Sequence, residues 1–121
     1  MKKVFGRNEN FPISSAILHD CKYEMEIGGN IGIGDSIEEQ TKYALDCIVE
    51  ELERVGWDLN NLIKMRIFLT TMEDYEGMNK AYTEYFQGYD YPARFGLSVV
   101  ELPAGSRIEI ESKAVGDTIQ E

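Results

Sequence analysis

A helical repeat of apolar residues between Ser36 and Gly56 is the feature of the sequence that most constrains the fold. Ser36 and Glu39 form a capping-box pattern, in which each side chain can satisfy a backbone amide at the start of a helix. Apolar residues then recur at a spacing typical of a helix with one buried face. These residues are Ile37, Ala44, Leu45, Ile48, Val49, Leu52 and Val55. We therefore predict a long amphipathic helix that ends at Gly56.

A second helix is predicted from about Glu73 to Phe86, with Gly88 just beyond its end. Its apolar stripe consists of Tyr75, Met78, Tyr82 and Phe86. The stripe again follows helical spacing, so this helix should also bury one face.

Short strand patterns surround the two helices. In residues 63–69 and 108–111 every second side chain is apolar, beginning with Ile63 and Ile108. This alternation is typical of half-buried strands. Residues 94–102 carry apolar side chains on both faces and are predicted to form another strand, joined to the last one by a tight connection. Weaker patterns predict two more strands, around residues 16–18 and 23–33.

The order of these elements predicts a single α+β domain over residues 1–121, with a mixed sheet. Right-handed crossovers would place both helices on the same face of the sheet. The opposite face would then be uncovered, although residues 94–102 supply apolar side chains to it. Because a monomer rarely leaves such a patch exposed, we expect the chain to associate with copies of itself.

The charge of the chain excludes several classes of partner. Twelve Lys and Arg against 22 Asp and Glu give a net charge of −10, which disfavours both nucleic acid and anionic membrane surfaces. A small anionic substrate would need a local cation. No stretch is long and apolar enough for a membrane span. The first residues lack the apolar segment of a secretory leader, and Cys21 and Cys47 form no CxxC pair, so we expect a cytoplasmic location.

The C-terminal third carries the signature of a known family. It resembles the Rid (YjgF-type) family of enamine and imine deaminases through Tyr91-Pro92-Ala93-Arg94, Val99-Val100-Glu101-Leu102-Pro103 and Ile108-Glu109-Ile110-Glu111. Further upstream, the matching residues are Glu39-Gln40-Thr41, Leu45, Gly56, Asn61-Leu62-Ile63-Lys64 and Asp74-Tyr75-Met78-Asn79-Tyr82-Phe86. The likeness covers roughly residues 36 to 115.

The resemblance implies a chorismate-mutase-like fold, in which three subunits pack their sheets into a central barrel with clefts at the subunit interfaces. It also implies hydrolysis of reactive 2-enamine and 2-imine acids, such as 2-aminoacrylate and 2-iminopropanoate, to 2-ketoacids and ammonium, with neither metal nor cofactor. An alternative from another class is a non-catalytic trimer that binds small carboxylates as a regulator.

The same resemblance assigns roles to particular residues. Arg94 matches the arginine that holds the substrate carboxylate, for which its planar fork is suited. Glu109 matches the glutamate that orients or deprotonates water, and Glu111 on the same strand face is its rival. Gly29 matches a glycine whose backbone approaches the ligand, and the Gly96 amide could bind a carboxylate oxygen or water. Structural roles stay open beside these: an ion pair for the arginine, a solvated face for the glutamates, and backbone geometry for the glycines.

Three departures from the family pattern affect the expected substrate range. Gly96 stands where many members carry a cysteine, so any thiol role is lost. The loop Asn30–Asp35 is short. Ile13 replaces a tyrosine near the site, and we therefore place Ile13 in the wall of the substrate-binding cleft. We expect activity to persist because Arg94 and Glu109 are both present.

Other chemistries find little support in the sequence. His19 is the only histidine, and no serine or cysteine motif surrounds it, which argues against a nucleophilic site or a metal site. Gly28–Gly34 is rich in glycine but lacks the Lys-Ser/Thr of a phosphate-binding loop. Some members of the Rid family have been described as endoribonucleases, an activity that the net charge of −10 disfavours here.

Overall fold

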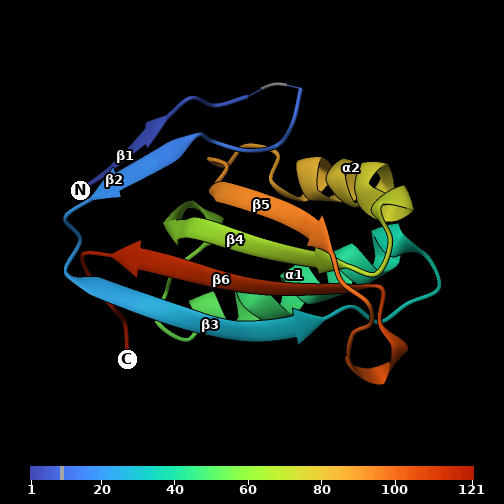
Figure 1. Cartoon of the computed structure of the whole chain (residues 1–121). Helices are drawn as coiled ribbons and strands as arrows, with labels where there is room; N and C mark the ends of the chain where they lie inside the picture. Colours follow the sequence, from blue (N-terminus) through green and yellow to red (C-terminus); the bar gives the residue numbers. More distant parts are fainter. Residues whose placement is uncertain (9) are drawn as a thin grey trace.

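A four-stranded mixed sheet forms the centre of the molecule, with the strands in the order β3–β6–β4–β5 (Figure 1). β3 spans Tyr23–Ile31, β4 spans Leu62–Leu69, β5 spans Ala93–Ser98 and β6 spans Ile108–Gly116. β6 pairs antiparallel with both β3 and β4, and β5 pairs parallel with β4 at one edge of the sheet. The computed structural model describes residues 1–8 and 10–121. It confirms the predicted α+β class.

Two helices cover one face of this sheet, α1 over Ile37–Glu53 and α2 over Tyr75–Tyr85 (Figure 1). Ser36 caps α1, because its hydroxyl accepts a hydrogen bond from the Glu39 amide at 3.0 Å. The chain then turns through Gly56, whose φ of 78° lies in the left-handed region that favours glycine. Both helices predicted from the sequence are therefore present. None of the described helices is both long and apolar enough to cross a membrane.

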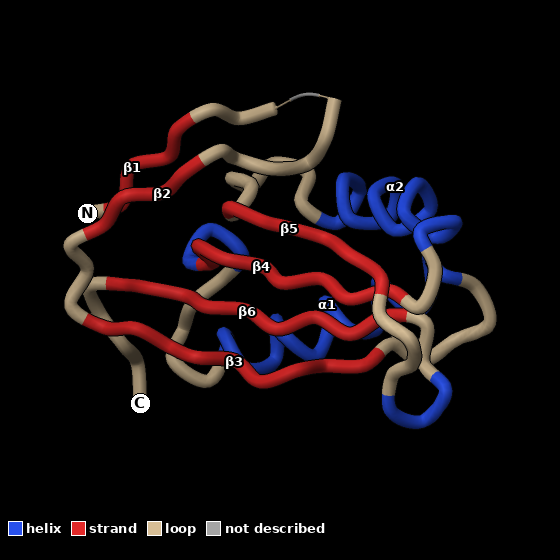
Figure 2. Tube along the Cα trace, in the orientation of Figure 1, coloured by secondary structure: helices blue, strands red, loops and turns tan. Residues whose placement is uncertain are grey.

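Three short 3-10 turns connect the larger elements: η1 over Leu59–Asn61, η2 over Met72–Asp74 and η3 over Pro103–Gly105. η2 leads directly into α2, so the α-helix begins at Tyr75 rather than at the predicted Glu73. η3 lies in the loop between β5 and β6, which projects beyond the end of the sheet (Figure 2).

An N-terminal hairpin forms a second, two-stranded sheet beside the first. β1 spans Lys2–Phe5 and pairs antiparallel with β2, which spans Ala16–His19. A single bridge between Ser14 and Ala93 connects this part of the chain to the β5 edge. The sequence predicted β2 and β3, whereas β1 was not located because its short run of charged and apolar residues carries a weak pattern.

The core lies between the helices and the sheet. Its largest fully buried side chains are Leu45, Ile48, Leu52, Leu62, Met65, Ile67, Leu69, Met78, Tyr82, Phe86, Ile108 and Ile110. They come from the predicted apolar stripes of both helices and from alternate positions of β4 and β6. Each such side chain stabilises the fold by about 1.5–3 kcal/mol relative to an exposed one.

The strand predicted over residues 94–102 is too long. β5 ends at Ser98, and Val100 in the following loop is 98% exposed. The strand ends here because its only neighbour in the sheet among the described residues, β4, ends at Leu69, which is in register with Ser98. Further along the loop, Pro103 has no amide hydrogen to donate, and Ala104 takes a left-handed φ of 58°. The apolar run was read as a strand, although its second half is a surface loop.

A bulge also changes which residues of β4 face the core. The register of β4 against β6 shifts between Leu62 and Lys64. Leu62 is consequently 1% exposed, and Ile63, which the alternating pattern assigned to the buried face, is only half-buried. The extra residue of a bulge reverses the alternation on one side of it.

The face of the sheet opposite the helices combines apolar and charged side chains. Phe95 and Leu97 are 37% and 41% exposed, and Phe95 packs edge-to-face against Phe68 with ring centroids 6.1 Å apart. Elsewhere on this face two ion pairs form, Arg66 with Glu111 at 3.0 Å and Lys113 with Glu26 at 3.1 Å. The uncovered apolar surface expected on this face is therefore present around β4 and β5.

Candidate active site

Arg94 lies on the helix-facing side of β5, in register with the buried Met65 of β4. Its Nη2 donates hydrogen bonds to Asn79 Oδ1 at 2.6 Å and to Tyr75 Oη at 3.3 Å. Its Nη1 lies 3.8 Å from the sulfur of Met78, which is a weak acceptor. The start of α2 thus holds the guanidinium in place from three side chains.

The positive charge of Arg94 is buried without a compensating carboxylate. The side chain is 9% exposed, and Nε is buried without a hydrogen-bond partner. Within residues 1–8 and 10–121, no Asp or Glu oxygen lies within ion-pair distance of this guanidinium, although the chain carries 22 acidic residues. A buried charge is stable only when it is paired or well hydrogen-bonded. This arrangement therefore fits an anion as its missing partner.

An aromatic ring also contacts the guanidinium of Arg94. The guanidinium carbon lies 4.8 Å from the ring centroid of Tyr82, a cation–π contact. Burial raises the pKa of the Tyr82 phenol far above its ordinary value, and the nearby Arg94 opposes that shift. Tyr82 is therefore neutral, so it cannot supply the missing negative charge.

Local sequence patterns indicate no functional role for Tyr75 and Asn79. The pattern Asp74-Tyr75-Met78-Asn79 was recognised as part of α2, and the spacing of four residues places Tyr75 and Asn79 on one helical face. That spacing was the available signal. Their contact with Arg94 depends on how α2 crosses β5, which no local pattern encodes.

Glu109 and Gly29 form the second part of the candidate site. Glu109 lies on β6 in register with Ile31 and Phe68, on the face away from the helices. A Cβ built on Gly29 would collide with the Glu109 carboxylate. Gly29 thus leaves room for the glutamate, so the structure brings these two predicted residues together.

Arg94 and Glu109 lie on opposite faces of the sheet. Arg94 is in register with Met65, and Glu109 with Phe68 of the same strand. Residues three apart on a strand point to opposite sides. One copy of the chain therefore does not bring the predicted arginine and glutamate together.

The remaining predicted residues occupy distinct positions. Glu111 is paired with Arg66, whereas no ion pair involves Glu109 in the part of the chain that the structure describes. Gly96 lies on the helix-facing side of β5, next to Tyr75. Ile13 is half-buried in the N-terminal segment, one residue before the bridge to β5.

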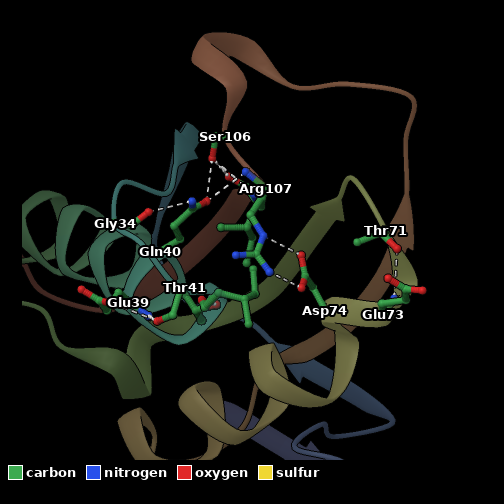
Figure 3. Close-up of polar contacts among 12 residues, drawn as sticks. Gly34, Glu39, Gln40, Thr41, Thr71, Glu73, Asp74, Ser106 and Arg107 are labelled. Carbon is green, nitrogen blue, oxygen red and sulfur yellow. Dashed lines mark hydrogen bonds and ion pairs between the residues drawn. The ribbon is translucent and has the colours of Figure 1, made fainter.

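A polar cluster, made of Gln40, Asp74, Ser106 and Arg107, links the two parts of the site (Figure 3). Arg107 forms a two-pronged ion pair with Asp74, whose Oδ2 accepts from Arg107 Nε at 3.0 Å. This hydrogen bond raises the pKa of Arg107. Gln40 Oε1 accepts from the Arg107 amide at 2.9 Å. Asp74 precedes Tyr75 and Arg107 is two residues before Glu109, so the polar cluster ties the start of α2 to the start of β6.

No group of three or more His, Cys, Asp or Glu side chains is arranged to hold a metal ion in residues 1–8 and 10–121. The chemistry available to the site as described is that of a guanidinium, a carboxylate, an amide and a phenol.

The chain is similar in sequence and in structure to proteins of one family. The Endoribonuclease L-PSP family matches residues 24–116. A 2-iminobutanoate/2-iminopropanoate deaminase of Mus musculus is 38% identical over 112 residues, which cover 86% of this chain and 81% of that protein. A YjgF-family protein of Neisseria meningitidis superposes with a TM-score of 0.72 at 25% identity, covering 96% of this chain and 95% of that one. E. coli TdcF with bound serine gives a TM-score of 0.75 at 25% identity, covering 80% and 84%.

The mixed sheet with two helices on one face defines an α+β protein, in which a buried arginine has no carboxylate partner among the described residues. The extent of the sequence match shows that the chain belongs to the Endoribonuclease L-PSP family, which is the YjgF or Rid family. The family and the YjgF-type fold predicted from the C-terminal signature are thereby confirmed.

Proposed function

We propose that this protein hydrolyses small 2-imino acids, such as 2-iminopropanoate, to 2-ketoacids and ammonium. Arg94 of one subunit holds the substrate carboxylate, and Glu109 of the partner subunit positions the attacking water. The single observation that carries the proposal is the buried guanidinium of Arg94, which has no carboxylate partner in the described chain.

The relatives support the class of substrate. The murine relative is named for the deamination of 2-iminobutanoate and 2-iminopropanoate, both small acids with one carboxylate. TdcF binds serine, another small carboxylic acid. A charge-assisted hydrogen bond to such a carboxylate contributes about 1.5–3 kcal/mol. A contact of this strength would let Arg94 bind the substrate carboxylate specifically but reversibly.

The reaction needs no redox step and no covalent bond to the protein. Water adds to the carbon of the protonated imine while the Glu109 carboxylate accepts its proton, which gives a carbinolamine. Glu109 returns that proton to the nitrogen, and the C–N bond breaks with the electron pair leaving on ammonia. The proton of the carbinolamine hydroxyl passes to this ammonia, which gives the ketone and ammonium. A positioned base of this kind is typically worth about 10²–10⁴-fold in rate. The proposed mechanism uses neither a metal nor a cofactor.

A closed homotrimer is the assembly we propose for bringing Arg94 and Glu109 together. The two residues lie on opposite faces of one sheet, so a shared cleft needs a second copy. The apolar residues Phe68, Phe95 and Leu97 on the open face supply a surface for that association.

Hydrolysis of RNA, which the family description suggests, fits this chain less well. The net charge is −10, and Arg66 and Lys113 on the open face are each paired with a carboxylate. Nucleic-acid binding depends on cations that are available to phosphates. The geometry therefore favours a small anion over a polyanion.

The test is an assay in which a pyridoxal-phosphate dehydratase releases 2-aminoacrylate from serine and pyruvate formation is followed. The protein should accelerate the loss of the imine beyond its spontaneous hydrolysis. Binding of small carboxylates without any acceleration would instead favour a regulatory protein, and would contradict the proposed enzyme.

Two substitutions test the assigned residues in the same assay. We expect Arg94→Ala to abolish the acceleration, because the carboxylate loses its cation. Glu109→Gln should lower the rate by about 10²-fold or more while a product carboxylate still binds. Arg54→Ala is the control, since Arg54 is exposed and forms an ion pair with Glu51 at the end of the same helix. Full activity of Arg94→Ala would refute the site.

A further inference from the structure

Tyr75 opens α2 and contacts Arg94 directly. Its hydroxyl accepts a hydrogen bond from Arg94 Nη2 at 3.3 Å, and the same Nη2 donates to Asn79 at 2.6 Å. The guanidinium carbon of Arg94 is 5.9 Å from the centroid of the Tyr75 ring. The ring and the hydroxyl of Tyr75 therefore both lie beside the guanidinium of Arg94.

The ring of Tyr75 rests against the backbone of Gly96. A Cβ at position 96 would lie 3.2 Å from Tyr75 Cε1, which is tighter than an ordinary van der Waals contact. The glycine at position 96 therefore leaves room for the aromatic ring that borders the guanidinium.

The contact of the Tyr75 hydroxyl with Arg94 does not use the hydroxyl proton. A phenol carries one proton and two lone pairs, and one lone pair already accepts from Arg94. No protein acceptor for that proton is found in residues 1–8 and 10–121. Arg94 Nε also has no partner. Two contacting side chains thus each keep one donor without an acceptor, next to a buried positive charge.

We propose that Tyr75 is a substrate-binding residue, whose hydroxyl donates a hydrogen bond to the carboxylate that Arg94 holds. The inference rests on the proposed function, because it names a second donor in the same site. The ligand class is a small 2-oxo or 2-imino carboxylate, whose oxygens accept from the Tyr75 hydroxyl and from the Arg94 guanidinium.

The experiment measures the Kd of the whole protein for pyruvate by NMR titration, since pyruvate carries the carboxylate but does not react. Tyr75→Phe removes the hydroxyl and keeps the ring, and it should raise the Kd about tenfold. Tyr85→Phe is the matched control, because the Tyr85 hydroxyl donates to Asp46 at 2.6 Å on another part of the helix pair. The control should leave the Kd within about twofold of the unmodified protein. A Tyr75→Phe variant that matches the control overturns the proposal.

A double-mutant cycle separates direct contact from a role that acts only through Arg94. In an Arg94→Lys background, direct donation predicts that Tyr75→Phe still raises the Kd by a similar factor. If the effect vanishes in this background, Tyr75 only positions the guanidinium and the proposal is wrong. In turnover, a pure binding contact predicts a higher KM with kcat little changed.

The outcomes also separate this inference from the proposed function. In one outcome, the protein fails to accelerate imine hydrolysis while Tyr75→Phe still weakens its binding of pyruvate. That result refutes the proposed enzyme activity and supports Tyr75 as a binding residue. If the protein accelerates imine hydrolysis but Tyr75→Phe does not change its affinity for pyruvate, the proposed enzyme activity is supported and this inference is refuted. Failure of the unmodified protein to bind pyruvate at millimolar concentration refutes the inference as well.

Discussion

The Glu109 carboxylate occupies the space beside Gly29 where a side chain would begin. Gly28, the preceding residue, has open space around the corresponding position. Neither glycine has a positive φ, so alanine is compatible with the backbone at both. The two neighbouring positions therefore differ in what they touch rather than in conformation, which makes them a matched pair.

We predict that Gly29→Ala lowers kcat about tenfold or more with a small change in stability, because the new methyl group displaces a flexible carboxylate rather than core atoms. Gly28→Ala should leave the rate unchanged. Imine hydrolysis and thermal unfolding of both variants provide the check. Equal rates for the two variants would mean that the position of Glu109 beside Gly29 does not matter for activity.

At the scale of residues, the sequence predicted the residues that lie in short motifs resembling the signature of the family. Arg94 and Glu109 were found in this way, and both remain proposals in their roles. Tyr75 and Asn79 were missed as partners of Arg94, because 19 and 15 residues separate them from it. Contacts over that distance depend on packing between elements, which single-sequence patterns do not report.

At the scale of elements, the β5–β6 loop is held by buried hydrogen bonds of Ser106 (Figure 3). The Ser106 hydroxyl donates to the Gly32 carbonyl at 2.9 Å and accepts from the Gly32 amide at 3.1 Å. It also lies 3.3 Å from Gln40 Oε1. The loop after β3 and the start of α1 are thus joined to the strand that carries Glu109.

We predict that Ser106→Ala lowers the free energy of unfolding by about 1–3 kcal/mol, because it leaves the buried Gly32 carbonyl without its hydroxyl donor. Ser112→Ala is the contrast. Ser112 is 1% exposed, but its hydroxyl has no hydrogen-bond partner, so its removal should be neutral or stabilising. Urea denaturation of both variants measures the difference. A loss of similar size in both would show that hydroxyl burial alone, rather than the bonds of Ser106, explains it.

Elements were predictable from the sequence where local chemistry marks both ends. Ser36 caps the start of α1, and the predicted end at Gly56 lies three residues beyond the observed end at Glu53. The apolar stripe of α2 was likewise recognised. The strand over residues 94–102 was predicted too long because apolar content alone does not distinguish a strand from an exposed loop. Val100, at 98% exposure, is apolar without being part of the core.

At the scale of the whole molecule, the sheet separates the cation from the carboxylate. Arg94 lies under α2 on one face, and Glu109 lies with Gly29 on the other. The sequence could not show this separation, because it depends on the register of β5 and β6 against β4. The proposed site between two copies rests on this separation, and the exposed Phe95 and Leu97 offer a surface for the proposed association.

A charged side chain introduced on the apolar surface around Phe95 and Leu97 should dissociate the proposed trimer. We predict that Leu97→Asp turns a particle of about three chain masses into single chains of 13.8 kDa, because a carboxylate cannot be buried unpaired in an apolar contact. Activity should fall with the loss of the trimer, while circular dichroism stays that of a folded chain, since Leu97 is 41% exposed within one copy. Sedimentation provides the measurement. An active monomer would contradict a site shared between subunits.

Mixing two inactive variants provides the most direct test of the shared site. Arg94→Ala keeps an intact Glu109, and Glu109→Ala keeps an intact Arg94. If each site takes its arginine from one subunit and its glutamate from the next, trimers reassembled from an equal mixture should recover about a quarter of the unmodified activity, because random assembly pairs the two intact residues at that fraction of interfaces. A site built within one chain would contain a defect in every copy, and the mixture would then stay inactive. Refolding the two variants separately before mixing, without exchange of subunits, is the control that should show no recovery.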